Sequence, residues 1–213
     1  MTLTSLLAEP NYTATPRPAS PADLSFTQML DQRQMRLRSR RMMLVLSKLI
    51  EDHAASVPGT FLIAAFQRYS LYQKQLRRYE RLARDCAQIF VMGLPDDEAP
   101  AIPKVEYLPL EETWPLIHEW VVIASGPACC IALFACDNEL AQPERRSRNF
   151  RALWTTNTHL VDSAVAAFYS AMGQRPPHIM HDGLATYHTT VALQQELPVR
   201  LRESLRAHSC ARR

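Results

Sequence analysis

Apolar runs bounded by turn-forming residues predict most of the strands of this chain. Residues 60–66, TFLIAAF, are apolar without alternation, which is typical of a strand buried on both faces. Further strands are expected at 88–93, 104–110, 118–125 and 128–136, and residues 150–155 form either a short strand or a turn. Because only a short Gly126-Pro127 link separates two of these runs, those two strands are expected to form an antiparallel hairpin.

Apolar residues at helical spacing predict the remaining elements. Within an expected helix over 25–55, Met35, Met42, Leu46 and Leu49 follow one another at steps of seven, four and three and form one apolar stripe. Helices are also expected over 70–85 and 157–172. Pro198 is expected to divide the C-terminal region into two short helices, at 182–196 and 199–208.

The order of these elements predicts an α+β (mixed α/β) fold. We expect a single central sheet of about four to five strands, flanked by helices and extended by helices at both ends. Residues 1–24 are expected to be a flexible arm, because they are rich in Pro, Ser and Thr. Residues 25–175 then form the folded domain with its basic leading helix, and residues 176–213 form a helical tail.

Composition and charge narrow the class of protein. Hydrophobic residues make up 47% of the chain, which is ordinary for a globular protein, and the net charge is +3. That charge is too small to indicate nucleic-acid binding, and no aromatic residues interleave with the basic ones to stack on bases. The chain has no apolar run long enough for a membrane span and no signal-peptide pattern at its start, so a cytoplasmic location is expected.

The familiar motifs of catalysis and cofactor binding do not occur in the sequence. The five glycines form neither GxGxxG nor a P-loop, and there is no GxSxG elbow. We therefore expect no catalytic residues and no enzyme activity, and the sequence predicts no particular cofactor. His178, His181 and Asp182 leave a metal site open as the alternative to a proline-rich linker, and the prediction is a linker without metal.

Five cysteines, an odd number, lie mostly in apolar or mixed segments, and none has the spacing of a zinc site. Reduced thiols are the simplest interpretation. The adjacent Cys129 and Cys130 are expected to be small buried residues, with redox sensing as the alternative.

A group of basic residues lies opposite the apolar stripe of the first expected helix. Arg33, Arg36, Arg40 and Arg41 form either a solvated face or a docking surface for an acidic partner. At the end of the strand over 60–66, Gln67 and Arg68 lie where open sheets place ligand contacts. A salt bridge from Arg68 to Glu119 or Asp137 is the competing interpretation.

Several stretches together resemble a known family. They are LSKLIEDHAAS…GTFLIAAFQRYSLYQKQLRRYERLARDCAQIFVMG, LIHEWVVIA, ACCIALFACD and RNFRALWTTNTHLVDSAVAAF, which together span about residues 43–172. This part of the chain resembles the DICT domain, named from diguanylate cyclases and two-component systems. The resemblance implies a sensory or signal-input domain with an α+β fold, suspected of a part in light responses and usually found beside kinase, cyclase, phosphodiesterase or DNA-binding modules.

Two hypotheses follow from the residues and the resemblance together. The first is a stand-alone signal-input module, light- or redox-related, that acts without catalysis through a protein partner such as a histidine kinase, a cyclase, or a component of a transcription or photosynthetic complex. Its ligand-binding candidates are Phe66, Gln67, Arg68, Glu119, Trp120, Asp137 and Trp154. The second is a ligand-free adaptor or regulatory subunit that docks an acidic surface through the Arg33–Arg41 helix. A homodimer through the amphipathic first helix is also expected.

Overall fold

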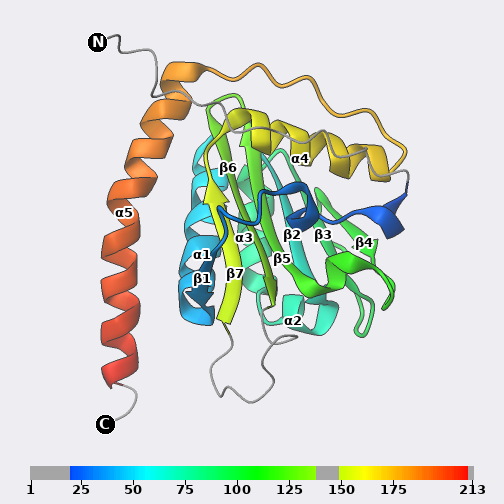
Figure 1. The fold of residues 1–213 in the computed structure, drawn as a ribbon, viewed down its shortest axis with the longest axis horizontal. Helices are drawn as coiled ribbons and strands as arrows, with labels where there is room; N and C mark the ends of the chain where they lie inside the picture. Colours follow the sequence, from blue (N-terminus) through cyan, green and yellow to red (C-terminus); the bar gives the residue numbers. More distant parts are fainter. Residues whose placement is uncertain (1–19, 138–148, 211–213) are drawn as a thin grey trace.

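One mixed sheet forms the centre of the molecule. The computed structural model describes residues 20–137 and 149–210, and in these residues the sheet has seven strands (Figure 1). In spatial order they are β1 (Arg36–Ser39), β7 (Asn149–Thr155), β6 (Cys129–Asp137), β5 (Glu119–Gly126), β2 (Phe61–Arg68), β3 (Gln88–Leu94) and β4 (Val105–Pro109). The α+β class with a single sheet agrees with the sequence analysis, but the expected number of four to five strands is wrong.

The helices lie on both sides of this sheet (Figure 1). The described α-helices are α1 (Arg40–Ser56), α2 (Tyr69–Gln73), α3 (Leu76–Asp85), α4 (Thr158–Ala171) and α5 (Gly183–Cys210). Short 3-10 helices are η1 (Pro21–Asp23), η2 (Thr27–Met29) and η3 (Pro115–His118). None of the helices in the described ranges is long and apolar enough to cross a membrane.

The sheet combines antiparallel and parallel pairs. β5 and β6 pair antiparallel as the predicted hairpin, and β2 lies between antiparallel β5 and parallel β3. This central position explains the unbroken apolar run of β2, because both of its faces are covered. The hairpin needs glycine at its end, since a β-carbon on Gly126 would lie 2.7 Å from the α-carbon of Thr60.

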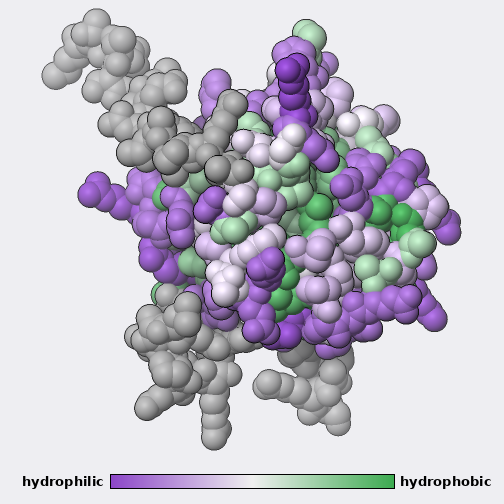
Figure 2. Space-filling model, turned by 90° about the vertical axis from the view of Figure 1, so that its right-hand side faces the viewer, coloured by the Kyte–Doolittle hydropathy of each residue, from purple (hydrophilic) through white to green (hydrophobic). Residues whose placement is uncertain are grey.

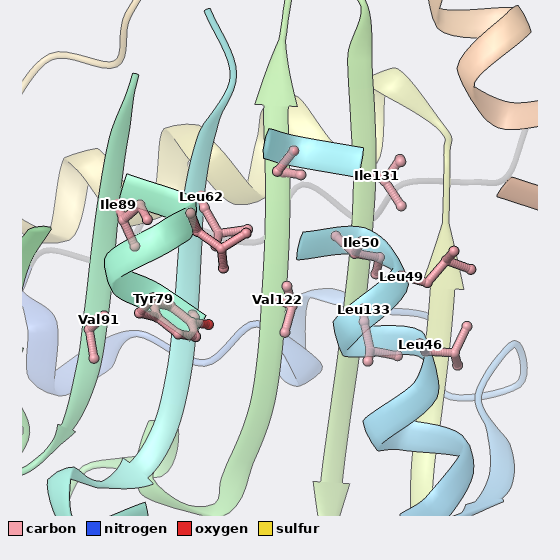
Figure 3. Packing of buried hydrophobic residues seen from close by; sticks show 14 of the residues in the cluster. Leu46, Leu49, Ile50, Leu62, Tyr79, Ile89, Val91, Val122, Ile131 and Leu133 are labelled. Carbon is pink, nitrogen blue, oxygen red and sulfur yellow. The ribbon is translucent and has the colours of Figure 1, made fainter. Parts of the chain in front are cut away.

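Alternate residues of the strands divide the core into two layers. On one face, Leu62, Val122 and Leu133 pack against α1, α3 and α5, and Figure 3 shows Leu46, Leu49 and Ile50 of α1 lying over these strands. The other face packs against α4 and the segment over residues 24–35. On the side shown in Figure 2, hydrophilic residues predominate and hydrophobic residues appear in smaller areas between them, as expected for an enclosed core.

The first expected helix is wrong in its N-terminal half. Residues 36–39 form the edge strand β1, antiparallel to β7, and the helix begins only at Arg40. The Ser39 hydroxyl caps this helix by accepting a hydrogen bond from the Met42 amide at 3.3 Å. Met35 is buried as expected, but it packs against the opposite face of the sheet from α1.

Two other helix predictions need correction. The helix expected over 70–85 is interrupted at Lys74 and Gln75, which separate α2 from α3. The break expected at Pro198 does not occur, because α5 continues through this residue from Gly183 to Cys210. A proline removes one backbone hydrogen bond from a helix interior, and packing of α5 against α1 and β6 offsets that loss.

Candidate functional site

A cavity of about 220 Å³ lies between α1 and the end of the sheet where β2 turns into α2. Ala64 and Val122 of the sheet and Phe150 of β7 form part of its apolar wall. Its volume is below the roughly 300–1,000 Å³ of sites for drug-sized molecules, so it suits a small ligand.

Consecutive turns of α1 supply one wall of the cavity. Ser47 and Glu51 are four residues apart, so they lie on the same side of the helix, and both face the cavity together with Leu44. Lys48 and Arg40 lie at its rim and are exposed to solvent. Sequence reasoning missed these residues as ligand contacts because it looked for polar groups at strand ends.

Gln67 lines the cavity at an irregularity in β2. The pairing of β2 with β3 changes register between Ala65 and Arg68, and the φ angle of Gln67 is 64°. Residues with a β-carbon seldom adopt this left-handed conformation, and doing so costs about 1–2 kcal/mol. The bulge turns Gln67 into the cavity wall, where Phe66 beside it also lies.

Aromatic side chains complete the walls. The Trp120 ring packs edge-on against Phe150 with centroids 5.5 Å apart, and its indole Nε1 donates a hydrogen bond to the Ser47 hydroxyl at 2.9 Å. Phe66 makes similar edge contacts with Tyr72 and Tyr79, each at 5.3 Å. These contacts hold the rings of the cavity wall in place before any ligand binds.

Glu51 is the acidic group of the cavity, and it is buried with 5% of its surface exposed. Its Oε2 accepts from Arg78 Nε at 2.5 Å and its Oε1 accepts from the Tyr79 hydroxyl at 3.0 Å. Burial raises the pKa of Glu51, against the opposing charge and hydrogen bond of Arg78. Arg78 thus balances the negative charge of Glu51, the acidic residue that the cationic side chains of the cavity rim face.

The same arginine connects the cavity to the C-terminal helix. Arg78 Nη2 donates to Asp52 Oδ1 at 2.6 Å, and the other oxygen of Asp52 accepts from Arg200 of α5. Arg200 also donates to Glu196 on its own helix. Burial alone raises the pKa of Asp52, but the hydrogen bonds and charges of Arg200 and Arg78 outweigh it and hold the pKa below its usual range. We call Glu51, Arg78, Asp52 and Arg200 the α1–α5 ion network.

The structure brings together three of the seven predicted ligand contacts, namely Phe66, Gln67 and Trp120. Arg68 is exposed, and its Nη1 lies 3.7 Å from Asp96 Oδ2, so the ion pair seen for Arg68 is with Asp96, not with the Glu119 or Asp137 of the competing interpretation. Asp96 also accepts from the amide and hydroxyl of Ser70 at the start of α2. Arg68 and Asp96 therefore belong to the junction of strand and helix.

Glu119 lies on the other face of the sheet from Trp120, as alternation along a strand requires. It is 2% exposed, and its carboxyl group accepts hydrogen bonds from the hydroxyls of Ser25 and Thr27 and from the amides of Phe26 and Thr27, at 2.6–3.3 Å. Burial raises its pKa, and these hydrogen bonds oppose the rise. We infer that Glu119 anchors the N-terminal segment. Asp137 and Trp154 lie at the β6–β7 side of the sheet and are not part of the cavity lining.

The predicted partner-binding arginines do not share one helix. Arg33 follows η2, Arg36 lies on β1, and Arg40 and Arg41 begin α1. Arg33, Arg36 and Arg40 are exposed, and Arg36 donates to the carbonyls of Arg33 and Met35. Docking of an acidic partner by these residues stays a prediction, but the single Arg33–Arg41 helix is corrected to a turn, a strand and a helix start.

The cysteines and the histidines singled out in the sequence do not line this cavity. Cys86, Cys129, Cys130 and Cys136 are free thiols, and burial raises the pKa of Cys129 to about 12. Of the expected His178, His181 and Asp182 trio, His178 is exposed and Asp182 caps α5 by accepting from the amides of residues 184 and 185. His181 instead points to Asp162 and lies near Cys130.

Comparison with known proteins identified a family. The profile of a family described as "Sensory domain in DIguanylate Cyclases and Two-component system", abbreviated DICT, matches residues 23–138. No curated protein and no solved structure matched the chain. The matched residues include β1 to β6 and α1 to α3, and thus nearly all of the cavity.

Proposed function

The chain belongs to the DICT family of sensory domains, and from this premise we propose that it is a signal-input module whose α1–sheet cavity binds a small anionic molecule. The observation that carries the proposal is a pre-formed cavity with an apolar, aromatic wall and cations at its rim. A sensory domain needs a site where a stimulus enters, and this cavity lies within the part of the chain that the family profile matches.

The chemistry of the lining defines the class of ligand. Phe66, Trp120 and Phe150 favour a flat apolar body, because aromatic rings pack well against one another. Lys48, Lys74 and Arg40 at the rim favour an anionic group that remains in contact with water. Small aromatic carboxylates and related amphipathic anions combine both features.

The α1–α5 ion network supplies a route from the cavity to the C-terminal helix. Glu51 faces the cavity and binds Arg78, Arg78 binds Asp52, and Asp52 binds Arg200. A ligand that alters the position of Glu51 changes the free energy of these ion pairs. Signalling then requires that the ligand bind more tightly to one of two arrangements of α5 than to the other.

The output of the module is proposed to be contact with a protein partner. The ligand changes how α5 packs on α1, and a partner recognises one arrangement without any chemical step in this domain. Two finer parts belong to the same proposal. The signal is related to light or redox state, and the partner is a histidine kinase, a cyclase, or a component of a transcription or photosynthetic complex.

The first experiment is a ligand comparison with matched probes. Indole-3-acetate and its neutral amide have the same ring system, so their difference in affinity reports the contribution of the charge. We expect the carboxylate to bind more tightly to the wild-type protein in isothermal titration calorimetry. In the double variant Lys48→Gln/Lys74→Gln this preference falls by about tenfold, since each exposed cation contributes up to about 1 kcal/mol.

The matched control is Arg77→Gln/Arg84→Gln, which removes two exposed positive charges of α3 that do not line the cavity. It keeps the preference for the carboxylate if the rim cations act locally. Equal loss in both double variants, or equal binding of acid and amide by the wild type, contradicts the proposal. Hydrogen exchange of α5 with bound indole-3-acetate then tests the route to the C-terminal helix, because an unchanged rate excludes it.

A further inference from the structure

Three potential metal ligands converge on the side of the sheet covered by α4. They are Cys130 of β6, Asp162 of α4 and His181, which precedes α5 by two residues. The nearest ligand atoms of the three side chains all lie within 4.8 Å of one another. They come from segments far apart in the sequence, so ordinary local spacing does not account for the cluster.

The hydrogen bonds of His181 determine which of its nitrogens is available. Nδ1 lies 3.0 Å from the carbonyl oxygen of Gly126, which only accepts hydrogen bonds, so Nδ1 carries a hydrogen. In the neutral ring Nε2 is then an acceptor, yet it faces Asp162 Oδ1 at 2.8 Å. Two acceptors at this distance need either a proton that one of them carries or a metal ion that both of them bind.

The arrangement of His181 is typical of metal ligands. A histidine that binds a metal through one nitrogen usually donates its other N–H to a carbonyl or carboxylate, which sets the tautomer and the ring orientation. The Gly126 carbonyl has this position here. The position of the Gly126 carbonyl is well defined, because the carbonyl of the adjacent residue, Pro127, accepts a hydrogen bond from the amide of Asp182 at 2.7 Å.

The set of donor atoms indicates the class of metal. A thiolate sulfur, an imidazole nitrogen and a carboxylate oxygen suit Zn²⁺, whereas Mg²⁺ and Ca²⁺ prefer oxygen ligands alone. Zinc–ligand bonds of about 2.0–2.3 Å place tetrahedral ligand atoms about 3.3–3.7 Å apart. Separations of up to 4.8 Å in the cluster therefore contract by at most roughly 1.5 Å, and the 2.8 Å separation of His181 Nε2 and Asp162 Oδ1 widens by about 0.5 Å. The Asp162 side chain is 48% exposed, which gives it room to move and leaves a path for the ion and for water as a fourth ligand.

We propose that Cys130, Asp162 and His181 form a Zn²⁺ site with three protein ligands and one water. The ion joins β6, α4 and the chain that leads into α5. It thereby fixes the N-terminal end of α5, while Arg200 fixes the same helix about 26 Å further along. The proposal does not depend on the anionic ligand of the α1–sheet cavity.

Cobalt is the probe that tests the site directly. Co²⁺ occupies tetrahedral zinc sites, and a bound thiolate adds a charge-transfer band in the near ultraviolet to the visible bands of the ion. We expect the full chain, stripped with a chelator, to develop both sets of bands with one equivalent of Co²⁺ and to lose them when Zn²⁺ is added. Cys130→Ala removes the charge-transfer band, while Cys136→Ala, a change of a thiol on the same strand, keeps it.

Two further variants keep the test decisive if Cys130→Ala fails to fold. Asp162→Asn changes an exposed side chain, and we expect it to weaken Zn²⁺ binding at least about tenfold in calorimetric titration. His178→Ala removes an exposed histidine three residues before His181 and leaves the affinity unchanged. Absence of the bands in the wild type, or full Zn²⁺ affinity in Asp162→Asn, overturns the proposal and assigns the contact to an ordinary hydrogen bond between His181 and Asp162.

Discussion

Gln67 shows how one residue shapes the cavity. Its positive φ angle accompanies the bulge of β2, and the bulge places a polar side chain in the wall of an otherwise apolar strand end. Residues in such strained conformations persist where the surrounding structure over-determines them, and they often mark ligand sites. The strain at Gln67 therefore supports a role for this residue in the cavity, and it lowers the stability of the fold.

We predict that Gln67→Gly stabilises the fold by about 1 kcal/mol, because glycine adopts a positive φ without a steric penalty. Gln67→Ala is the matched control, since it also removes the amide but keeps the β-carbon and hence the strain. Urea denaturation monitored by tryptophan fluorescence measures both free energies of unfolding. If the glycine variant is no more stable than the alanine variant, the positive φ carries no strain.

Residues at strand ends were partly predictable as cavity residues. Phe66, Gln67 and Trp120 follow from the apolar runs, because a run that stops at polar residues identifies the strand end. Glu119 was expected beside Trp120, but neighbours in a strand point to opposite faces, and the sequence does not reveal which face has the cavity. No such signal marks Glu51 in the sequence, because it lies two residues after Leu49 and five after Leu46, on the other side of α1 from the predicted apolar stripe.

At the scale of elements, tertiary contacts decide where local preference is ambiguous. Residues 36–39, RLRS, have side chains that suit a helix, but backbone pairing with β7 makes them a strand. This edge strand has no apolar alternation, so its pattern contained no strand signal. In α5 the opposite occurs, because packing maintains a helix through Pro198 despite the missing amide hydrogen.

The contact between α1 and α5 is predicted to depend on pH. The pKa of Asp52 is lower in the folded protein than its usual value of 3.8, so ionised Asp52 stabilises the fold above that pH. This stability is lost as the pH falls through the lowered pKa and the carboxylate becomes protonated. We expect Asp52→Asn to reduce the free energy of unfolding by about 1 kcal/mol at neutral pH, since the ion pairs are partly exposed.

The difference between wild type and Asp52→Asn should accordingly vanish in acid below the folded pKa of Asp52. Asp85→Asn serves as the control, because Asp85 is an exposed carboxylate of α3 outside the α1–α5 ion network. Its difference from wild type should stay within about 0.5 kcal/mol. A pH-independent difference for Asp52→Asn would show that its ion pairs with Arg78 and Arg200 do not stabilise the fold.

At the scale of the whole molecule, the question is whether the C-terminal helix α5 is part of the folded core or a separate tail. Residues 176–213 are predicted to be a tail, and the family profile ends at residue 138. Yet α5 packs along α1 and β6, and Leu193 of α5 is fully buried in the same core layer as Leu46 and Leu133. Because α5 contributes a buried residue to this layer, its packing stabilises the folded sheet. Displacement of α5 by a signal therefore costs free energy.

We predict from this packing that Leu193→Ala lowers the free energy of unfolding by about 2–5 kcal/mol, the range for a leucine removed from a core. Leu205→Ala is the matched control on the same helix, where the side chain is 57% exposed, and it should change stability by less than about 0.5 kcal/mol. Thermal and urea denaturation of both variants give the comparison. Equal small effects would mean that α5 detaches from the core at little cost in free energy and is a separate tail. A large effect at Leu193 alone would make α5 an integral part of the sensory domain. A signal that moves α5 must then act through the packing of the domain core.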